Sequence, residues 1–446
     1  MLCVAWLLAA APGLVTGELR EHVEALASDD FAGRETGSAG GRLAAEYIAA
    51  GLEAAGASPA GDAGTFFQAV PVVQWVQVAA PTLELHTEGG ESVAASFGEF
   101  TARAREPLDG VLEVKVVEGP EDLPAPRSDL ALFMTKSRSR WTAWLDEGGA
   151  AGGRGYGLVI YETRLKSSGA WSAARPRWGL DGPSTGPINE LAVRDELAER
   201  FESGEVLRIA VDLKLRAQRL AASNVVAVVP GSEPESGETV LVSAHYDHLG
   251  TREPEEEGAD TVYNGADDNA SGVAFTIELA RAMAAEPPKR NVVFLLVTGE
   301  ERGLLGMRHY VDHPVVPLAE TLFNFNLEML GRPDDLAGGS GRMWLTGWER
   351  TSLGGLIEAA GCSVIGDPRP EQGFYRRSDN YPLAKAGVVA QTFSSFGMHD
   401  DYHRASDEAD TLDYEHMDAA LATCATILRQ IAGGSWSPQW LEGGRP

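Results

Sequence analysis

The chain has 446 residues, of which 65 are Asp or Glu and 37 are Lys or Arg, so its formal net charge at pH 7 is −28. Hydrophobic residues make up 44% and charged residues 23%, which is typical of a folded globular protein with room for two or three domains. The negative charge argues against nucleic acid or an anionic membrane surface as a partner, because both require a basic face. After the first 17 residues no apolar run approaches the roughly 18 residues that span a bilayer, so we expect no integral membrane span.

The first 17 residues resemble the apolar core of a secretory signal. They contain no charged residue, and the small residues Thr16 and Gly17 lie near a suitable cleavage point. We therefore predict a signal peptide over residues 1–17 and export to the periplasm or the extracellular space. No Lys or Arg precedes Arg20, so the alternative is an ordinary buried N-terminal helix. Cys362 and Cys424 would remain in the exported chain, and the sequence leaves open whether they form a disulfide or stay thiols.

The next 200 residues change from helical to β-rich. Helical spacing of apolar residues begins at Glu18 and returns over Gly41 to Ala55. We assign residues 18–75 to the first part of one domain and residues 76–220 to a β-rich insert. The strands expected in the insert are 110–117, 130–134, 158–161 and 207–215.

From residue 221 onward, apolar strands alternate with amphipathic helices. This pattern predicts an α/β fold, a three-layer sandwich around a mostly parallel central sheet. We assign 221–435 to the main part of this domain and 436–446 to a C-terminal tail. The expected strands are 225–229, 240–244, 292–297, 322–327, 343–346 and 388–393, and the expected helices include 271–286 and 414–431.

Side chains that bind metals follow several of these strands. In open α/β sheets, ligands bind at the carboxyl ends of the strands, so these residues are expected at one edge. Each has a simpler interpretation, since Asp267 and Asp268 could cap the following helix and Glu300 and Glu301 could be a solvated pair. Glu328 is harder to dismiss, because a carboxylate at the end of an apolar strand needs a cation. The candidates are His245, Asp247 and His248; Asp267 and Asp268; Glu300 and Glu301; Glu328; and His399, Asp400 and His403.

Two histidines and three carboxylates can hold two zinc ions, with one carboxylate bridging them. Such a pair lowers the pKa of a shared water and polarises a substrate carbonyl. A carboxylate that does not bind metal is then needed to take the proton of the water, and the Glu300–Glu301 pair suits this division. In a competing interpretation, His399 and His403 have the i, i+4 spacing of a mononuclear zinc-protease helix. Asp400 follows His399, however, and Phe396-Gly397 opposes a continuous helix.

Five motifs in order carry a family resemblance. They are Ser-Ala-His245-Tyr-Asp247-His-Leu-Gly, Asn-Gly-Ala-Asp267-Asp-Asn-Ala-Ser-Gly, Thr-Gly-Glu300-Glu301-Arg-Gly-Leu-Leu-Gly, Asn-Leu-Glu328-Met and Asp-Tyr-His403-Arg-Ala-Ser-Asp. Together they resemble the co-catalytic dizinc exopeptidases, which include secreted bacterial aminopeptidases and glutamate carboxypeptidase. Arg377-Ser-Asp-Asn380-Tyr-Pro also matches a family motif, with Asn380 where the family often has His. Residues 27–34 look like the start of the same domain, and the β-rich insert resembles a protease-associated domain.

The resemblance implies a role for each matched residue. One zinc ion would be held by His245, Asp267 and Glu328, and the other by Asp267, Glu301 and His403. Asp267 would bridge the two ions, Glu300 would be the general base, and Asp247 would orient His245. The Asp267–Asp268 peptide bond would be cis, as is common in this family. Glu328 departs from the family, in which many members carry Asp, and this could alter the metal preference.

We therefore expect a zinc-dependent exopeptidase, foremost an aminopeptidase that acts on the N-termini of peptides or proteins. Two alternatives on the same fold are a glutaminyl cyclase-like acyl transfer and a carboxypeptidase. The carboxypeptidase would need an Arg or Lys cluster that the motifs do not supply. A binding ectodomain without activity would have lost ligands, and none is missing. The acidic run of Glu253, Glu255, Glu256, Glu257 and Asp260 is better explained as a solvated loop than as an attractor of substrate ammonium.

Overall fold

The computed structural model describes residues 16–96, 99–135, 155–163, 176–181, 189–233, 237–254 and 256–446. The chain divides into two compact units, one formed by Met1–Pro71 and Ala221–Pro446 and the other by Val72–Leu220. Helix α1 (Thr16–Leu26) includes the two residues expected at the cleavage point. The rest of the predicted signal peptide lies outside the described residues.

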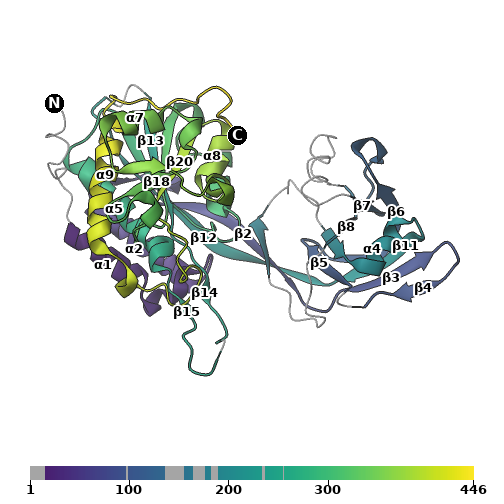
Figure 1. Ribbon diagram of the computed structural model, residues 1–446. Coiled ribbons are helices and arrows are strands. Elements are labelled where there is room, and N and C mark those ends of the chain that lie inside the picture. Colours follow the sequence, from purple (N-terminus) through teal and green to yellow (C-terminus); the bar gives the residue numbers. More distant parts are fainter. Residues whose placement is uncertain are drawn as a thin grey trace. The chain divides into compact units, whose positions relative to one another are not determined.

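A mixed β-sheet forms the centre of the first unit (Figure 1). Its strands follow the order β19-β18-β20-β17-β13-β16-β12, and β20, β17, β13 and β16 run parallel to one another. These central strands are buried on both faces, which is why their sequences are almost continuously apolar. The predicted α/β sandwich is confirmed. The bounds are β12, Leu215–Val229; β13, Thr239–His245; β16, Asn291–Val297; β17, Thr321–Leu327; β18, Met343–Leu345; β19, Val364–Gly366; and β20, Val389–Ser394.

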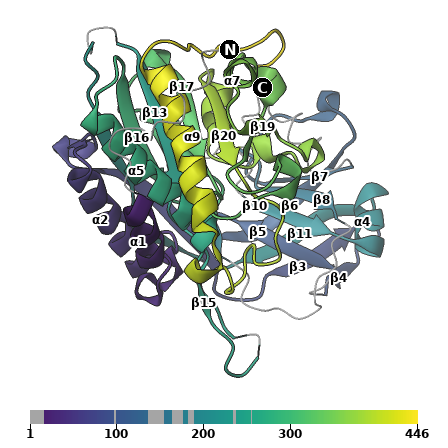
Figure 2. The same cartoon turned by 60° about the vertical axis from the view of Figure 1, so that its left-hand side comes forward.

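Helices cover both faces of this sheet. Figure 2 shows α1, α2 (Ala39–Ala54), α5 (Gly272–Ala285) and α9 (Tyr414–Ala432) on one face. Alternate side chains of β13 point to opposite faces, so Val240 and Val242 join the core beneath these four helices, whereas Leu241 joins the other core. That second core receives α6 (Leu305–Asp312) and α8 (Asn380–Ala386). Helix α7 (Leu353–Ala360) contributes Leu353 and Ile357 to the first core.

The second unit contains an eight-stranded sheet in the order β4-β3-β11-β6-β7-β8-β10-β5. Helix α4 (Asp195–Glu202) packs on it through Phe201, whose ring stacks on Phe133 at a centroid distance of 5.3 Å. β2 (Phe67–Gln77) and β12 are the strands at which the chain passes between the two units. The other bounds are β3, Thr82–Thr87; β4, Ser92–Ala94; β5, Phe100–Ala104; β6, Leu108–Val117; β7, Leu130–Met134; β8, Leu158–Glu162; β10, Asn189–Val193; and β11, Val206–Leu213.

Cys362 and Cys424 are both free thiols. Cys424 is buried on α9, with its Sγ 3.7 Å from Sδ of Met343, so it acts as a core side chain. Within the described part of the chain, no helix has both the length and the apolar character needed to cross a membrane.

The stacked ring pair Phe325–Phe393 links neighbouring strands of the first core, with centroids 4.1 Å apart and both rings fully buried. Phe325→Ala should lower the free energy of unfolding by about 3–5 kcal/mol, because it removes buried apolar area and leaves a cavity. Leu336→Ala is the matched control, since Leu336 is 60% exposed and its truncation should change stability by less than about 0.5 kcal/mol. Urea unfolding of both variants measures the difference, and equal effects would contradict this assignment of the core.

Candidate metal centre

The metal-binding candidates come from the ends of three adjacent parallel strands. His245 is the last residue of β13, Glu328 directly follows β17, and Glu300 and Glu301 follow β16 after two residues. Because β13 pairs in parallel with both β16 and β17, their carboxyl ends lie at the same edge of the sheet. Two loops, around residues 264–272 and 399–407, complete the site from outside the sheet.

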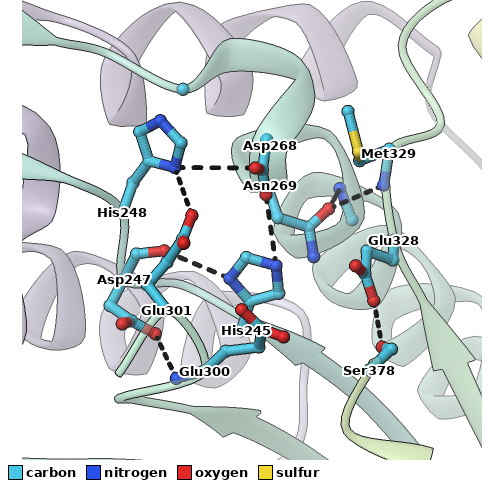
Figure 3. Close-up of polar contacts among 12 residues, drawn as sticks. His245, Asp247, His248, Asp268, Asn269, Glu300, Glu301, Glu328, Met329 and Ser378 are labelled. Atoms are coloured by element: carbon cyan, nitrogen blue, oxygen red, sulfur yellow. Dashed lines mark hydrogen bonds and ion pairs between the residues drawn. The ribbon is translucent and has the colours of Figure 1, made fainter. Parts of the chain in front are cut away.

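Asp268 lies at the centre of this cluster (Figure 3). Its Oδ1 is 3.3 Å from Nε2 of His245, and its Oδ2 is 3.2 Å from Nε2 of His403. Oε1 of Glu301 is 3.3 Å from the same His403 nitrogen and 3.0 Å from Nδ1 of His248. One carboxylate therefore contacts histidines from two different loops, which is the arrangement that a bridging ligand requires.

Asp267, for which the sequence predicted this bridging position, points elsewhere. Its Oδ1 accepts a hydrogen bond of 2.7 Å from the Gly331 amide, and its Oδ2 is 3.0 Å from Nε2 of His399. The cis peptide bond also lies one residue later than predicted, between Asp268 and Asn269. The prediction of a cis Asp267–Asp268 bond is thus wrong. Two consecutive Asp residues offer the same ligand chemistry, and only the backbone path of the turn decides which one faces the histidines.

Hydrogen bonds to neighbouring segments hold this turn. The carboxylate of Asp407 accepts from the amides of Asp267 and Asp268 at 3.1 Å. Asn269 donates to the carbonyl of Leu327 and accepts from the amide of Met329, which fixes the turn to the end of β17. Asp407 was not among the site residues predicted from the sequence. Its position in the Asp-Tyr-His403-Arg-Ala-Ser-Asp motif was the available signal.

Asp247 also acts differently from the expectation. Nδ1 of His245 is 3.1 Å from the main-chain oxygen of Asp247, not from its carboxylate. The carboxylate instead accepts from the Thr36 hydroxyl at 2.7 Å and from the Glu300 amide at 3.1 Å. The main chain of Asp247 therefore orients His245, while its side chain holds the backbone of Glu300.

Glu328 is held by its neighbours on the loop before α8. The hydroxyl of Ser378 donates a hydrogen bond to Oε2 of Glu328. The next residue, Asp379, is fully buried, and neither of its oxygens has a hydrogen-bond partner among the described residues. Burial, together with repulsion by Glu328, raises the pKa of Asp379 to about 8. Asp379 therefore holds a proton at neutral pH and adds no charge to the cluster.

The adjacent carboxylates Glu300 and Glu301 have opposite pKa shifts. Separation from bulk water, reinforced by repulsion from Glu328, raises the pKa of Glu300 well above its ordinary value. Burial would also raise the pKa of Glu301, but the adjacent imidazoles of His248 and His403 lower it to about 2. Such a difference between neighbours is typical of sites in which one carboxyl carries a proton and the other stays ionised.

The donor atoms of the cluster fit zinc. Nε2 of His245, Nε2 of His403 and Oε1 of Glu301 are buried, and none of them makes a hydrogen bond of good geometry with the described residues. Zn²⁺ binds imidazole nitrogen and carboxylate oxygen, and it offers these atoms the partner that they lack. The side chains of His248, Asp268 and Glu301 place ligand atoms within 4.8 Å of one another.

The segment that contains the cluster is similar to known peptidases. Residues 224–428, which contain all the candidate ligands, match peptidase family M28. This segment, slightly less than half of the chain, is similar to that peptidase family. The chain is 31% identical over 155 residues to aminopeptidase YwaD of Bacillus subtilis. The matched residues make up 34% of this chain and 29% of that protein. It is also 37% identical over 106 residues to a protein of Pyricularia oryzae named as a probable zinc metalloprotease. Here the matched residues make up 24% of this chain and 19% of that protein.

The match thus spans less than a third of the length of either relative. Among solved structures, the fold is similar to that of an aminopeptidase from Aneurinibacillus sp. strain AM-1, with a TM-score of 0.60 and 18% identity. That similarity covers 95% of both chains. At this identity it establishes the shared fold.

The competing mononuclear interpretation is wrong. None of the residues 399–403 is helical, and residues 400–403 form turns, so the i, i+4 spacing does not place the two histidines on one face. His399 contacts Asp267, whereas His403 contacts Asp268 and Glu301.

The acidic run after β14 (Gly250–Thr251) is exposed at Glu253, Glu256, Glu257 and Asp260, while Glu255 lies outside the described residues.

A pocket opens directly above the cluster. Asp268, Glu300, Glu328 and His403 are among its lining residues. Aromatic side chains also line the pocket, and Arg377 is the one Lys or Arg side chain among its lining residues. The pocket can therefore receive a substrate with both polar and apolar parts. The aromatic lining residues are Trp344, Phe374, Phe396 and Tyr402.

The exchange of roles between the two neighbouring Asp residues can be tested by mutation. Asp268→Asn should lower zinc affinity at least tenfold, because it removes the charge of the carboxylate that both histidines contact. Asp267→Asn should bind zinc nearly as well as the native chain, because an amide oxygen still accepts from Gly331. Isothermal titration with zinc measures both variants. Loss of binding in Asp267→Asn alone would restore the assignment made from the sequence.

Proposed function

We propose that this chain is a zinc-dependent aminopeptidase with two zinc ions. His245, Asp268 and Glu328 would hold one ion, and Asp268, Glu301 and His403 the other. The observation that supports this most directly is the central place of Asp268 between His245 and His403, at the floor of an open pocket. When bound, the ions would supply the Lewis acidity that activates a water and polarises the scissile carbonyl.

Glu300 would move the proton in this reaction. Its backbone is held by the Asp247 carboxylate, its side chain lines the pocket, and its raised pKa suits a group that takes a proton and gives it back. Glu300 would accept the proton of the attacking water and pass it to the leaving amine. Asp247 and Thr36 would keep it in position without touching the substrate.

The charge of the pocket favours N-terminal recognition over C-terminal recognition. A carboxypeptidase needs a cluster of cations for a terminal carboxylate, and the lining contains one arginine. The aromatic side chains of the pocket would receive the side chain of the N-terminal residue. The cyclase alternative needs a single zinc ion, whereas here two sets of ligands share Asp268.

The remaining predictions made from the sequence belong to the same proposal. Export would follow from the uncharged apolar segment over residues 1–17, which is consistent with action on extracellular or periplasmic peptides. The β-rich unit of Val72–Leu220 would be a protease-associated-like insert. The substrates would be peptides or proteins with a free N-terminus.

The Glu300→Gln variant tests whether Glu300 transfers the proton. The variant should retain its zinc, because Glu300 is not among the proposed ligands, but it should release N-terminal amino acids about 10²–10⁴-fold more slowly, because an amide cannot shuttle the proton. Amino acid release from peptides with free N-termini measures the rate, and metal analysis confirms zinc retention. A chelator should abolish release by the native chain.

Three results would contradict the proposal. Zinc-loaded native protein that releases no amino acid would exclude an aminopeptidase. Ammonia release from peptides with N-terminal glutamine would instead indicate the cyclase. An active Glu300→Gln variant would remove Glu300 from the mechanism while leaving the metal centre intact.

A further inference from the structure

Arg34 is a fully buried arginine beneath the candidate metal centre. It ends the short helix η2 (Asp29–Arg34), and its side chain has no exposed surface. Among the described residues, its guanidinium donates only to main-chain carbonyl oxygens: Nε to Tyr246 at 2.9 Å, Nη1 to Leu26 at 2.5 Å and to Asn264 at 2.6 Å, and Nη2 to Gly265 at 2.9 Å.

Three of these carbonyls belong to the two loops that carry ligands. Tyr246 lies next to His245, and Asn264 and Gly265 lie three to four residues before Asp268. The donors of the planar guanidinium have fixed directions, so they set both the distance and the angle between the two loops. The flexible side chain of a lysine, with its single ammonium group, does not fix both. The backbone amide of His248 also donates to the Arg34 carbonyl at 3.3 Å.

The residues beside Arg34 bind the same loops. Thr36 donates to the Asp247 carboxylate, and Glu35 pairs through its main chain with His248. At Gly33, which has a φ of +66°, an added Cβ would lie 2.6 Å from the carbonyl oxygens of Gly250 and Tyr263. The segment from Gly33 to Thr36 is therefore packed closely against both loops, and Arg34 is its central contact.

The charge of Arg34 also suits this location. Burial lowers its pKa to about 10, and attraction to Asp268, Asp407 and Asp247 opposes this shift. At neutral pH the guanidinium therefore stays charged. It places a permanent cation under a cluster of carboxylates without forming a direct ion pair with any of the described residues, so it leaves their oxygens free for other partners.

We propose that Arg34 is a positioning residue for the metal centre: by binding carbonyls on both loops, it holds Asp268 at the distance from His245 that a shared ion requires. This inference rests on the proposed two-metal function. A purely structural arginine is the alternative, and the two make different predictions for metal binding by the folded protein.

Cobalt binding distinguishes them. Arg34→Met should bind Co²⁺ at least about tenfold more weakly than the native chain in competition with a chelator, because the loops that carry the ligands lose their common anchor. Its cobalt absorption spectrum should also change, since the ligand geometry is altered. Arg34→Lys keeps the charge without the fork, and it should show the same two changes to a smaller extent.

Arg290→Met is the matched control. Arg290 is also buried, at 7% exposed, and its Nη1 donates to the carbonyls of Ile431 and Trp436. It directly precedes β16, however, at the opposite end of the strand from Glu300 and Glu301. Arg290→Met should lower stability while cobalt affinity and spectrum stay native.

Cobalt affinity and spectrum that stay native in either Arg34 variant would overturn the inference. If Arg34→Met does not fold, Arg34→Lys decides by the same two readouts. Equal weakening of cobalt binding in Arg290→Met would also overturn it, since the effect would then follow general stability. A native chain that binds no metal would instead contradict the proposed function itself.

Discussion

The structure depends on the concentration of carboxylates at one edge of a parallel sheet. Such a group of acids repels itself strongly unless cations or protons compensate it. The structure provides several kinds of compensation. Histidines contact the ionised Glu301 and Asp268, a proton remains on Asp379, and the buried Arg34 lies underneath. The lone pairs that are still without partners face one another across the space where metal ions would bind.

The fold produces this concentration by simple means. Parallel strands end at the same edge, so the residues that follow β13, β16 and β17 meet there whatever their distance in the sequence. The loop from Gly265 to Gly272 adds the shared carboxylate from the start of α5. Hydrogen bonds between the side chains of Asn269 and Asp407 and the main chain fix its path, while Ala266 and Ala270 pack in the apolar core on either side of Asp268.

Much of this arrangement could be predicted from the sequence, and the exceptions have physical causes. The central strands were recognisable because burial on both faces requires continuous apolar runs, and His245, Glu301, Glu328 and His403 were placed at the correct edge. The choice between Asp267 and Asp268 could not be made, because adjacent residues of one type differ only in the direction that the backbone gives them. The role of Arg34 was equally hidden, since its partners lie up to 231 residues away and are main-chain atoms.

The central claim is that Asp268 is the ligand shared by two zinc ions. Crystals of the zinc-loaded native protein, measured at the zinc absorption edge, test it most directly. The account predicts two anomalous peaks, one beside His245 and Glu328 and one beside Glu301 and His403, with the Asp268 carboxylate between them. A single peak, or a peak beside Asp267 and His399, would contradict it.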